Sequence, residues 1–188
     1  MAWIINDGTP CDKLEYKGME IVKSSTPTLF KKYLKEIVGN IIKGSDKESI
    51  NSRIKEIRDE VMEKDVEEMG FARSANNISQ YNLGDCRWKK GTPVHIKASI
   101  VYNHLLNSLK LTGKYPEINN GNKMSFIYLR DNPYETIGFV DEIPKEFGLH
   151  KFIDFDKQFD KGFEKPIQQF FDVLKWGQIN YNHFDLLA

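Results

Sequence analysis

The sequence has few cysteines. Only Cys11 and Cys86 occur in a chain of 188 residues, and they stand far apart. Two isolated thiols do not form a disulfide framework, and neither has a second cysteine or histidine at the spacing of a zinc site. This scarcity excludes a disulfide-rich secreted domain and indicates a reducing, cytosolic setting.

Long apolar runs are also missing. No stretch approaches the about 20 apolar residues of a membrane-spanning helix, and the opening segment MAWIINDGTP is too short and too polar for a secretory signal. We therefore expect no membrane partner. The sequence shows neither an internal repeat nor a low-complexity linker. Its length suits one large domain, or a domain with an appendage, that buries its own core.

The common catalytic motifs are absent too. The chain has no Gly-x-Ser-x-Gly, no Walker loop and no His-Glu-x-x-His, and its four histidines are scattered. Asp154 and Asp156 form an acidic pair, but they stand at an expected helix start, where acids interact favourably with the helix dipole. The sequence therefore predicts no catalytic residue, metal ligand or cofactor of its own.

The sequence also lacks a net charge. The chain has 27 Lys and Arg against 27 Asp and Glu, so no overall field favours nucleic acid or a membrane. The charge is nevertheless uneven along the chain. Residues 71–110 hold six bases and one acid, whereas residues 45–70 hold nine acids and five bases. An acidic helical segment thus precedes a basic segment that contains several glycines.

Apolar spacing predicts the fold class, which is α+β. A repeat of four, three and four residues predicts helices over 27–42 and 45–64, which form a hairpin around Gly44. Alternating residues on both sides of an Asp-Asn-Pro turn predict two antiparallel strands over 123–140. We therefore expect a mainly helical fold with a small antiparallel sheet.

Other segments complete this prediction. A short strand is expected at the N-terminus, and the polar stretch 70–93 reads as a loop. Residues 94–111 should form a helix whose inner face includes Leu109. Residues 151–176 should form a long helix with Phe170 and Leu174 on its apolar side, bent or restarted at Pro166.

The stretch KSSTP comes directly before the first predicted helix. Ser25 or Thr26 suits its N-cap, and Pro27 suits its first turn. The N–H groups of a helix start also bind phosphate, and Lys23, Ser24, Ser25 and Thr26 add one cation and three hydroxyl groups. A plain cap and a phosphate site are both compatible with these residues.

The basic segment contains RSANNISQYN and RWKKGTPVHIK. Short polar side chains and cations of this kind are typical of sequence-independent contact with a nucleic-acid backbone, although an ordinary exposed loop has a similar composition. The candidate residues are Arg73, Ser74, Asn76, Asn77, Lys89, Lys90, Thr92, His95 and Lys97.

The last residues, HFDLLA, place Phe184, Leu186 and Leu187 at the C-terminus. Apolar side chains at a chain end serve either as a docking peptide or as a segment that folds back on its own domain. Both interpretations fit the sequence.

Together these motifs have an order that resembles a known family. YKGMEIVKSSTP, a helical hairpin, ARSANNISQY, KKGTPVHIKASIVYNHLL, NPYETIGF and IPKEFGLHKFIDFDKQFDKGFEKP follow one another. The series is similar to the C-terminal part of T-even-type phage replicative DNA polymerases of family B, and the resemblance covers essentially the whole chain. It implies the end of the palm at 1–22, a thumb at 23–177 and a flexible clamp-binding tail at 178–188.

The resemblance also implies a role and partners. A thumb grips the primer–template duplex, and its contacts would fall on Lys23 to Thr26, Arg73 to Asn77 and Lys89 to Lys97. Phe184, Leu186 and Leu187 would dock on the sliding clamp. The short N-terminal strand would belong to the palm. The protein would act in the cytoplasm of the infected host cell.

The catalytic parts of such a polymerase are not in this sequence. The palm aspartates that bind Mg²⁺, the fingers and the exonuclease domain would belong to an N-terminal polymerase fragment, so this chain alone is expected to be inactive. We expect a split polymerase gene or an isolated fragment. The alternative is a free-standing, non-catalytic adaptor that binds duplex DNA or associates with the clamp.

Overall fold

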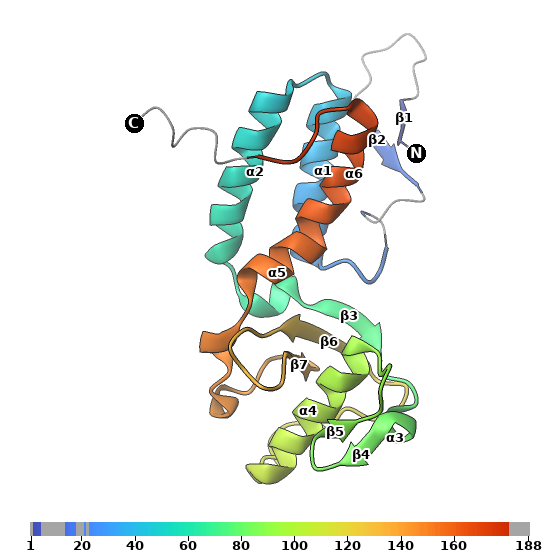
Figure 1. The fold of residues 1–188 in the computed structure, drawn as a ribbon, viewed down its shortest axis with the longest axis vertical. Helices are drawn as coiled ribbons and strands as arrows, with labels where there is room; N and C mark the ends of the chain where they lie inside the picture. Colours follow the sequence, from blue (N-terminus) through green and yellow to red (C-terminus); the bar gives the residue numbers. More distant parts are fainter. Residues whose placement is uncertain (1, 5–13, 18–20, 22, 181–188) are drawn as a thin grey trace. The chain divides into compact units, whose positions relative to one another are not determined.

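The chain forms two units, each with its own core. Unit one comprises residues 1–64 and 159–188, and unit two comprises residues 65–158. The computed structural model describes residues 2–4, 14–17, 21 and 23–180 (Figure 1). In this part of the chain, no helix is both long and apolar enough to cross a membrane. The predicted limits of palm, thumb and tail stay predictions.

Unit one is built on the predicted helical hairpin of α1 (Thr28–Ile42) and α2 (Lys47–Met62) (Figure 1). Gly44, at φ +91°, lies in the turn between them, and the Asp46 carboxylate caps α2 by accepting a hydrogen bond of 2.8 Å from the Ser49 N–H. The apolar repeat forms the buried faces, which include Ile37 of α1 and Ile57 of α2. The hairpin prediction is confirmed.

A small ribbon and a third helix complete this unit. Strands β1 (Ala2–Ile4) and β2 (Leu14–Tyr16) pair antiparallel with each other. Helix α6 (Lys165–Leu174) packs against α1. After α6, the Ile179 N–H donates to Gln168 Oε1 over 3.0 Å. The start of the predicted tail is therefore bound to α6.

The last predicted helix is not continuous. It consists of α5 (Phe155–Phe159), the π-helical turn η5 (Asp160–Glu164) and α6, which has a proline in its first turn as predicted. The wider π turn shifts the phase of the residues that follow it. Phe171 is therefore buried, whereas Leu174 is 41% exposed and Phe170 is only partly buried, so this part of the predicted apolar face is wrong.

Unit two contains a three-stranded antiparallel sheet of strand order β3-β6-β7, with β3 at Phe71–Ser74, β6 at Lys123–Tyr128 and β7 at Thr136–Phe139. Strands β6 and β7 are the predicted pair, in a register that sets Ile127 opposite Ile137. Strand β3 lies in the segment predicted as a loop, and that prediction is wrong. Its side chains are mostly exposed, so an apolar pattern could not reveal it.

Helix α4 (Val94–Ser108) packs across β7. A Cβ atom on Gly138 would lie 2.8 Å from Met124 Cε and 3.0 Å from the carbonyl oxygen of Ala98, so the missing side chain allows α4 to approach β7 this closely. The helix is the predicted one, but Leu109 follows its end and is 46% exposed, contrary to the prediction.

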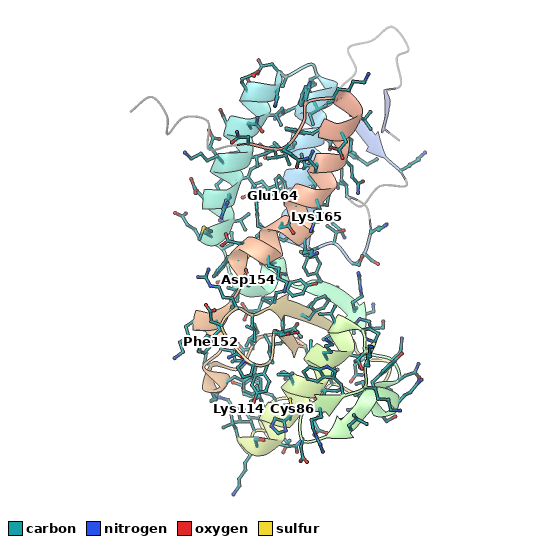
Figure 2. All side chains as sticks on the ribbon, in the orientation of Figure 1. Cys86, Lys114, Phe152, Asp154, Glu164 and Lys165 are labelled. Carbon is teal, nitrogen blue, oxygen red and sulfur yellow. The ribbon has the colours of Figure 1, made fainter. Side chains whose placement is uncertain are left out.

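The shorter elements of unit two surround this sheet. They are η2 (Val66–Met69), α3 (Ile78–Tyr81), β4 (Asn82–Gly84), β5 (Arg87–Trp88), η3 (Lys145–Phe147) and η4 (His150–Phe152). Asp154 precedes α5, and its carboxylate accepts a 3.0 Å hydrogen bond from the Lys157 N–H (Figure 2). Asp154 therefore acts as the helix cap that the sequence indicated.

Candidate nucleic-acid interface

The predicted contact residues fall into both units. Lys23, Ser24, Ser25 and Thr26 precede α1 in unit one, whereas the segments beginning at Arg73 and Lys89 belong to unit two. Each group is therefore described within its own unit. The clamp residues Phe184, Leu186 and Leu187 lie outside the described residues.

Helix α1 begins one residue later than predicted, and the predicted N-cap at Ser25 or Thr26 is wrong. Helix α1 begins at Thr28 with Pro27 as its N-cap, and Pro27 makes no side-chain capping bond. The preceding residues form a turn instead, in which the Thr26 N–H donates to the Lys23 carbonyl over 3.2 Å. Lys23 and Ser24 are exposed, and Ser25 is half-buried. Thr26 is only 8% exposed, so its side chain faces the protein.

Arg73, Ser74, Asn76 and Asn77 lie along one edge of the sheet and just beyond it. All four side chains are exposed. Strand β3 pairs with β6 on one side only, which leaves its other side as the sheet edge. Ala75 fixes the end of the strand, because its N–H donates to the Asn122 carbonyl over 2.9 Å. The polar groups around it therefore have a rigid base.

The Lys89–Lys97 group joins the β4–β5 hairpin to α4. The Lys89 N–H donates to the Tyr81 carbonyl over 3.0 Å, and the Thr92 hydroxyl donates to the Lys89 carbonyl over 2.6 Å. Thr92 is 6% exposed, so it holds the turn and leaves Lys89 and Lys90 exposed. Lys97 Nζ lies 5.4 Å from the centroid of the Trp88 ring, a cation–π contact.

His95 connects these two groups. Burial lowers the pKa of the His95 imidazole, and the nearby positive charge of Arg73 lowers that pKa further. Arg73 of the first predicted group and His95 of the second are therefore close enough for their charges to interact.

The described residues contain no group of three or more His, Cys, Asp and Glu side chains placed to hold a metal ion. In the same residues, every buried polar side-chain atom has a hydrogen-bond partner. The described part of the chain is therefore not arranged as a metal centre, and on the surface of α4 the Ser108 hydroxyl lies 3.5 Å from His104 Nε2.

Two exposed residues of the β4–β5 hairpin were not among the predicted contacts. Arg87 has a side chain that is 69% exposed, and Leu83 is 53% exposed. Arg87 contributed to the basic count, but an isolated leucine in a polar stretch carries no signal that it will be exposed. Only the structure shows that Arg87 and Leu83 lie exposed on the same hairpin.

No protein-family model matches the sequence. The chain is 29% identical, over 171 residues, to a protein of Escherichia phage RB69 described as a DNA-directed DNA polymerase. The matched residues are 87% of this chain but 18% of the phage protein, so the chain spans less than a fifth of that relative. The chain is therefore similar to one part of a phage DNA polymerase.

Proposed function

We propose that this chain is the thumb part of a DNA-directed DNA polymerase and that it grips primer–template duplex through the sugar-phosphate backbone. The similarity to part of a phage polymerase supports this role, as does the order of motifs along the chain. The proposed contacts are the exposed residues of the KSSTP stretch and of the interface described for unit two.

One observation carries the proposal. Four cations of unit two lie on β3, on the segment between β5 and α4, and in the first turn of α4, and none of them pairs with a carboxylate among the described residues. These cations are Arg73, Lys89, Lys90 and Lys97. Surface cations next to short amide and hydroxyl side chains are well suited to phosphate oxygens, and they place no requirement on base sequence.

The proposed role is positional. By holding the duplex, the thumb would keep the primer 3′ hydroxyl where bond formation takes place. This positioning lowers the entropic part of the activation free energy for nucleotide addition. Polymerases use Mg²⁺ ions on carboxylates for the chemical step. The described residues offer no such cluster, so in our proposal the palm aspartates lie outside this chain, in a polymerase fragment that also carries the fingers and exonuclease.

A second contact belongs to the same proposal. Phe184, Leu186 and Leu187 would dock on a sliding clamp as an apolar peptide. Deleting residues 181–188 should then abolish capture of the chain by a purified phage clamp while leaving duplex binding unchanged. Equal capture of the full and shortened chains would exclude this contact.

The double variant Lys89→Ala/Lys90→Ala tests the main proposal. Both cations are exposed, and in this proposal they contact phosphates of the DNA backbone. We therefore expect weaker duplex binding for every DNA sequence. The slope of log affinity against log salt should become shallower by about 0.9 for each lost phosphate contact. The matched control is Lys145→Ala/Lys151→Ala, two exposed lysines elsewhere in unit two. Equal affinities of wild type and the first variant at every salt concentration would contradict the assignment.

A further inference from the structure

The β4–β5 hairpin of unit two has a two-residue tip. Asp85 and Cys86 connect the strands, with φ angles of 48° and 55°, and Gly84 before them has a φ of 81° (Figure 2 labels Cys86). Positive φ at both loop residues matches the twist of a two-residue hairpin, and aspartate adopts it readily, but cysteine adopts it at a cost. The chain thus keeps a two-residue tip despite backbone strain at Cys86, and such strain is a frequent property of functional sites.

The base of the hairpin is firmly held. Trp88 packs against the core of unit two, and Lys97 Nζ lies over its ring. The Lys89 N–H continues the ladder by donating to the Tyr81 carbonyl, and the Gly84 N–H donates to Asn82 Oδ1 over 2.9 Å. Side chains on the other side of the hairpin are therefore presented in a defined geometry.

The outer side of the hairpin combines an apolar side chain with cations. Successive residues of a strand point to opposite faces, so Arg87 points away from the side on which Trp88 packs, and the exposed Lys89 follows directly after β5. The register pairs Asn82 with Trp88 and Gly84 with Arg87, which leaves Leu83 as the extra residue of a bulge. Bulges redirect side chains, and Leu83 is 53% exposed.

We infer that this outer side is a DNA-contact element in which Arg87 and Lys89 pair with phosphates and Leu83 packs against the deoxyribose and base-edge surface between them. The inference rests on the proposed function. A duplex presents phosphates beside the less polar surface of sugars and base edges, and apolar side chains inserted among cations are used by other groove-binding proteins. Arg87 is available for this contact, because its ion pair with Asp85 is long, at 3.6 Å, and exposed pairs of this kind are weak.

The two kinds of contact leave different signatures in a salt series. Leu83→Ala removes an uncharged side chain and releases no counterion, so affinity should fall about five-fold, as expected for a partly desolvated leucine, with an unchanged salt dependence. Arg87→Ala removes a phosphate contact, so affinity should fall and the slope of log affinity against log salt should become shallower by about 0.9. A general loss of structure would not produce this pair of results.

The test is a fluorescence-anisotropy titration of a labelled primer–template duplex with the full chain over a range of salt concentrations. The controls are Leu109→Ala, a second half-exposed leucine of unit two, and Lys145→Ala, a second exposed cation. The variant Cys86→Gly relieves the strain at that residue, retains the tip and leaves Asp85 in place, so it should bind as wild type does. Circular dichroism establishes that each variant is folded.

The outcomes separate the inference from the proposed function. If wild type binds duplex and the Leu83 and Arg87 variants behave as their controls do, the hairpin contact is wrong and the thumb proposal stands. If only the Arg87 variant is weakened, the apolar contact is wrong. If wild type binds no duplex even at low salt, the proposed function fails, and the inference fails with it.

Discussion

Gly162, in the π-helical turn before α6, lies directly against the ring of Phe30 in α1. A Cβ atom at Gly162 would come within 2.3 Å of Phe30 Cδ2, and Phe30 is completely buried. The two residues are distant in sequence, and their contact joins the π-helical turn to the first helix of unit one. The missing side chain at Gly162 is therefore a packing requirement.

We expect Gly162→Ala to destabilise the protein by about 1 to 3 kcal/mol, because the added methyl group forces Phe30 out of a filled core. Chemical denaturation monitored by circular dichroism measures this change. Gly113→Ala is the control, since a Cβ atom there meets nothing within 4 Å. Equal midpoints for the two variants would show that the turn accommodates a side chain.

Arg53 is expected to hold the two helices of the hairpin together. From α2 its guanidinium donates to Glu36 of α1 over 2.5 Å, and to Glu56 and Glu60 of its own helix over 2.9 and 2.6 Å. Arg53→Met should lower the free energy of unfolding at neutral pH by about 1 to 2 kcal/mol, since three carboxylates lose a shared cation. Arg53→Lys should recover only part of this loss, because an ammonium group cannot form the same fork.

The effect of Arg53 should depend on pH. Hydrogen bonds from Arg53, and next from Tyr33, hold the pKa of Glu60 below its ordinary value. A carboxyl group with a lowered folded-state pKa stabilises the fold above its unfolded pKa of about 4.3, and the contribution is lost as pH falls through the folded value. Urea denaturation of wild type and Arg53→Met should therefore give converging stabilities below about pH 4. A constant difference down to pH 3 would contradict this account.

Duplex binding should be coupled to protonation of the His95 imidazole. Burial and the charge of Arg73 lower its pKa, so the free protein has a neutral imidazole at pH 7.5. A nearby phosphate favours the imidazolium form, so binding takes up a proton, and affinity should rise a few-fold between pH 7.5 and pH 6. His95→Gln should remove this rise. If both proteins show the same pH dependence, His95 is not close to the bound backbone.

In the free protein, a lower pH should have the opposite effect: it should reduce folding stability. Because the folded-state pKa of His95 lies below the unfolded value of about 6.5, the unfolded chain takes up the proton first. Stability should therefore fall as pH drops below about 6.5 and until the folded value is passed. Thermal denaturation of wild type and His95→Gln at pH 7.5 and pH 5.5 separates this stability effect from the binding effect.

Periodic apolar residues made the main elements of this fold predictable. The spacing of Ile50, Ile54, Ile57 and Val61 predicted a helix, and these four side chains are the buried face of α2. The β6–β7 pair was predictable for a similar reason, because a turn separates two apolar stretches. Where the buried residues follow a regular apolar pattern, the sequence alone predicts the element.

Elements without such a pattern were not predictable. Strand β3 is held by hydrogen bonds to β6 and exposes Ala72, Arg73 and Ser74, so its sequence resembles a loop. The π turn at Asp160–Glu164 shifted the helix phase, which is why Phe171 is buried in place of Phe170. At the candidate site, the sequence was sufficient to nominate the cations as contact residues. The exposure of Leu83 was not predictable, because it depends on a bulge that only the structure shows.

The central claim is that this chain binds duplex DNA through its phosphates, and the most direct test is the affinity of the purified chain for a primer–template duplex as a function of salt. The account predicts a linear fall of log affinity with log salt, with a slope of roughly −3 to −5 for four to five neutralised phosphates, for any DNA sequence. Failure to bind at low ionic strength, or an affinity that does not change with salt, would contradict it.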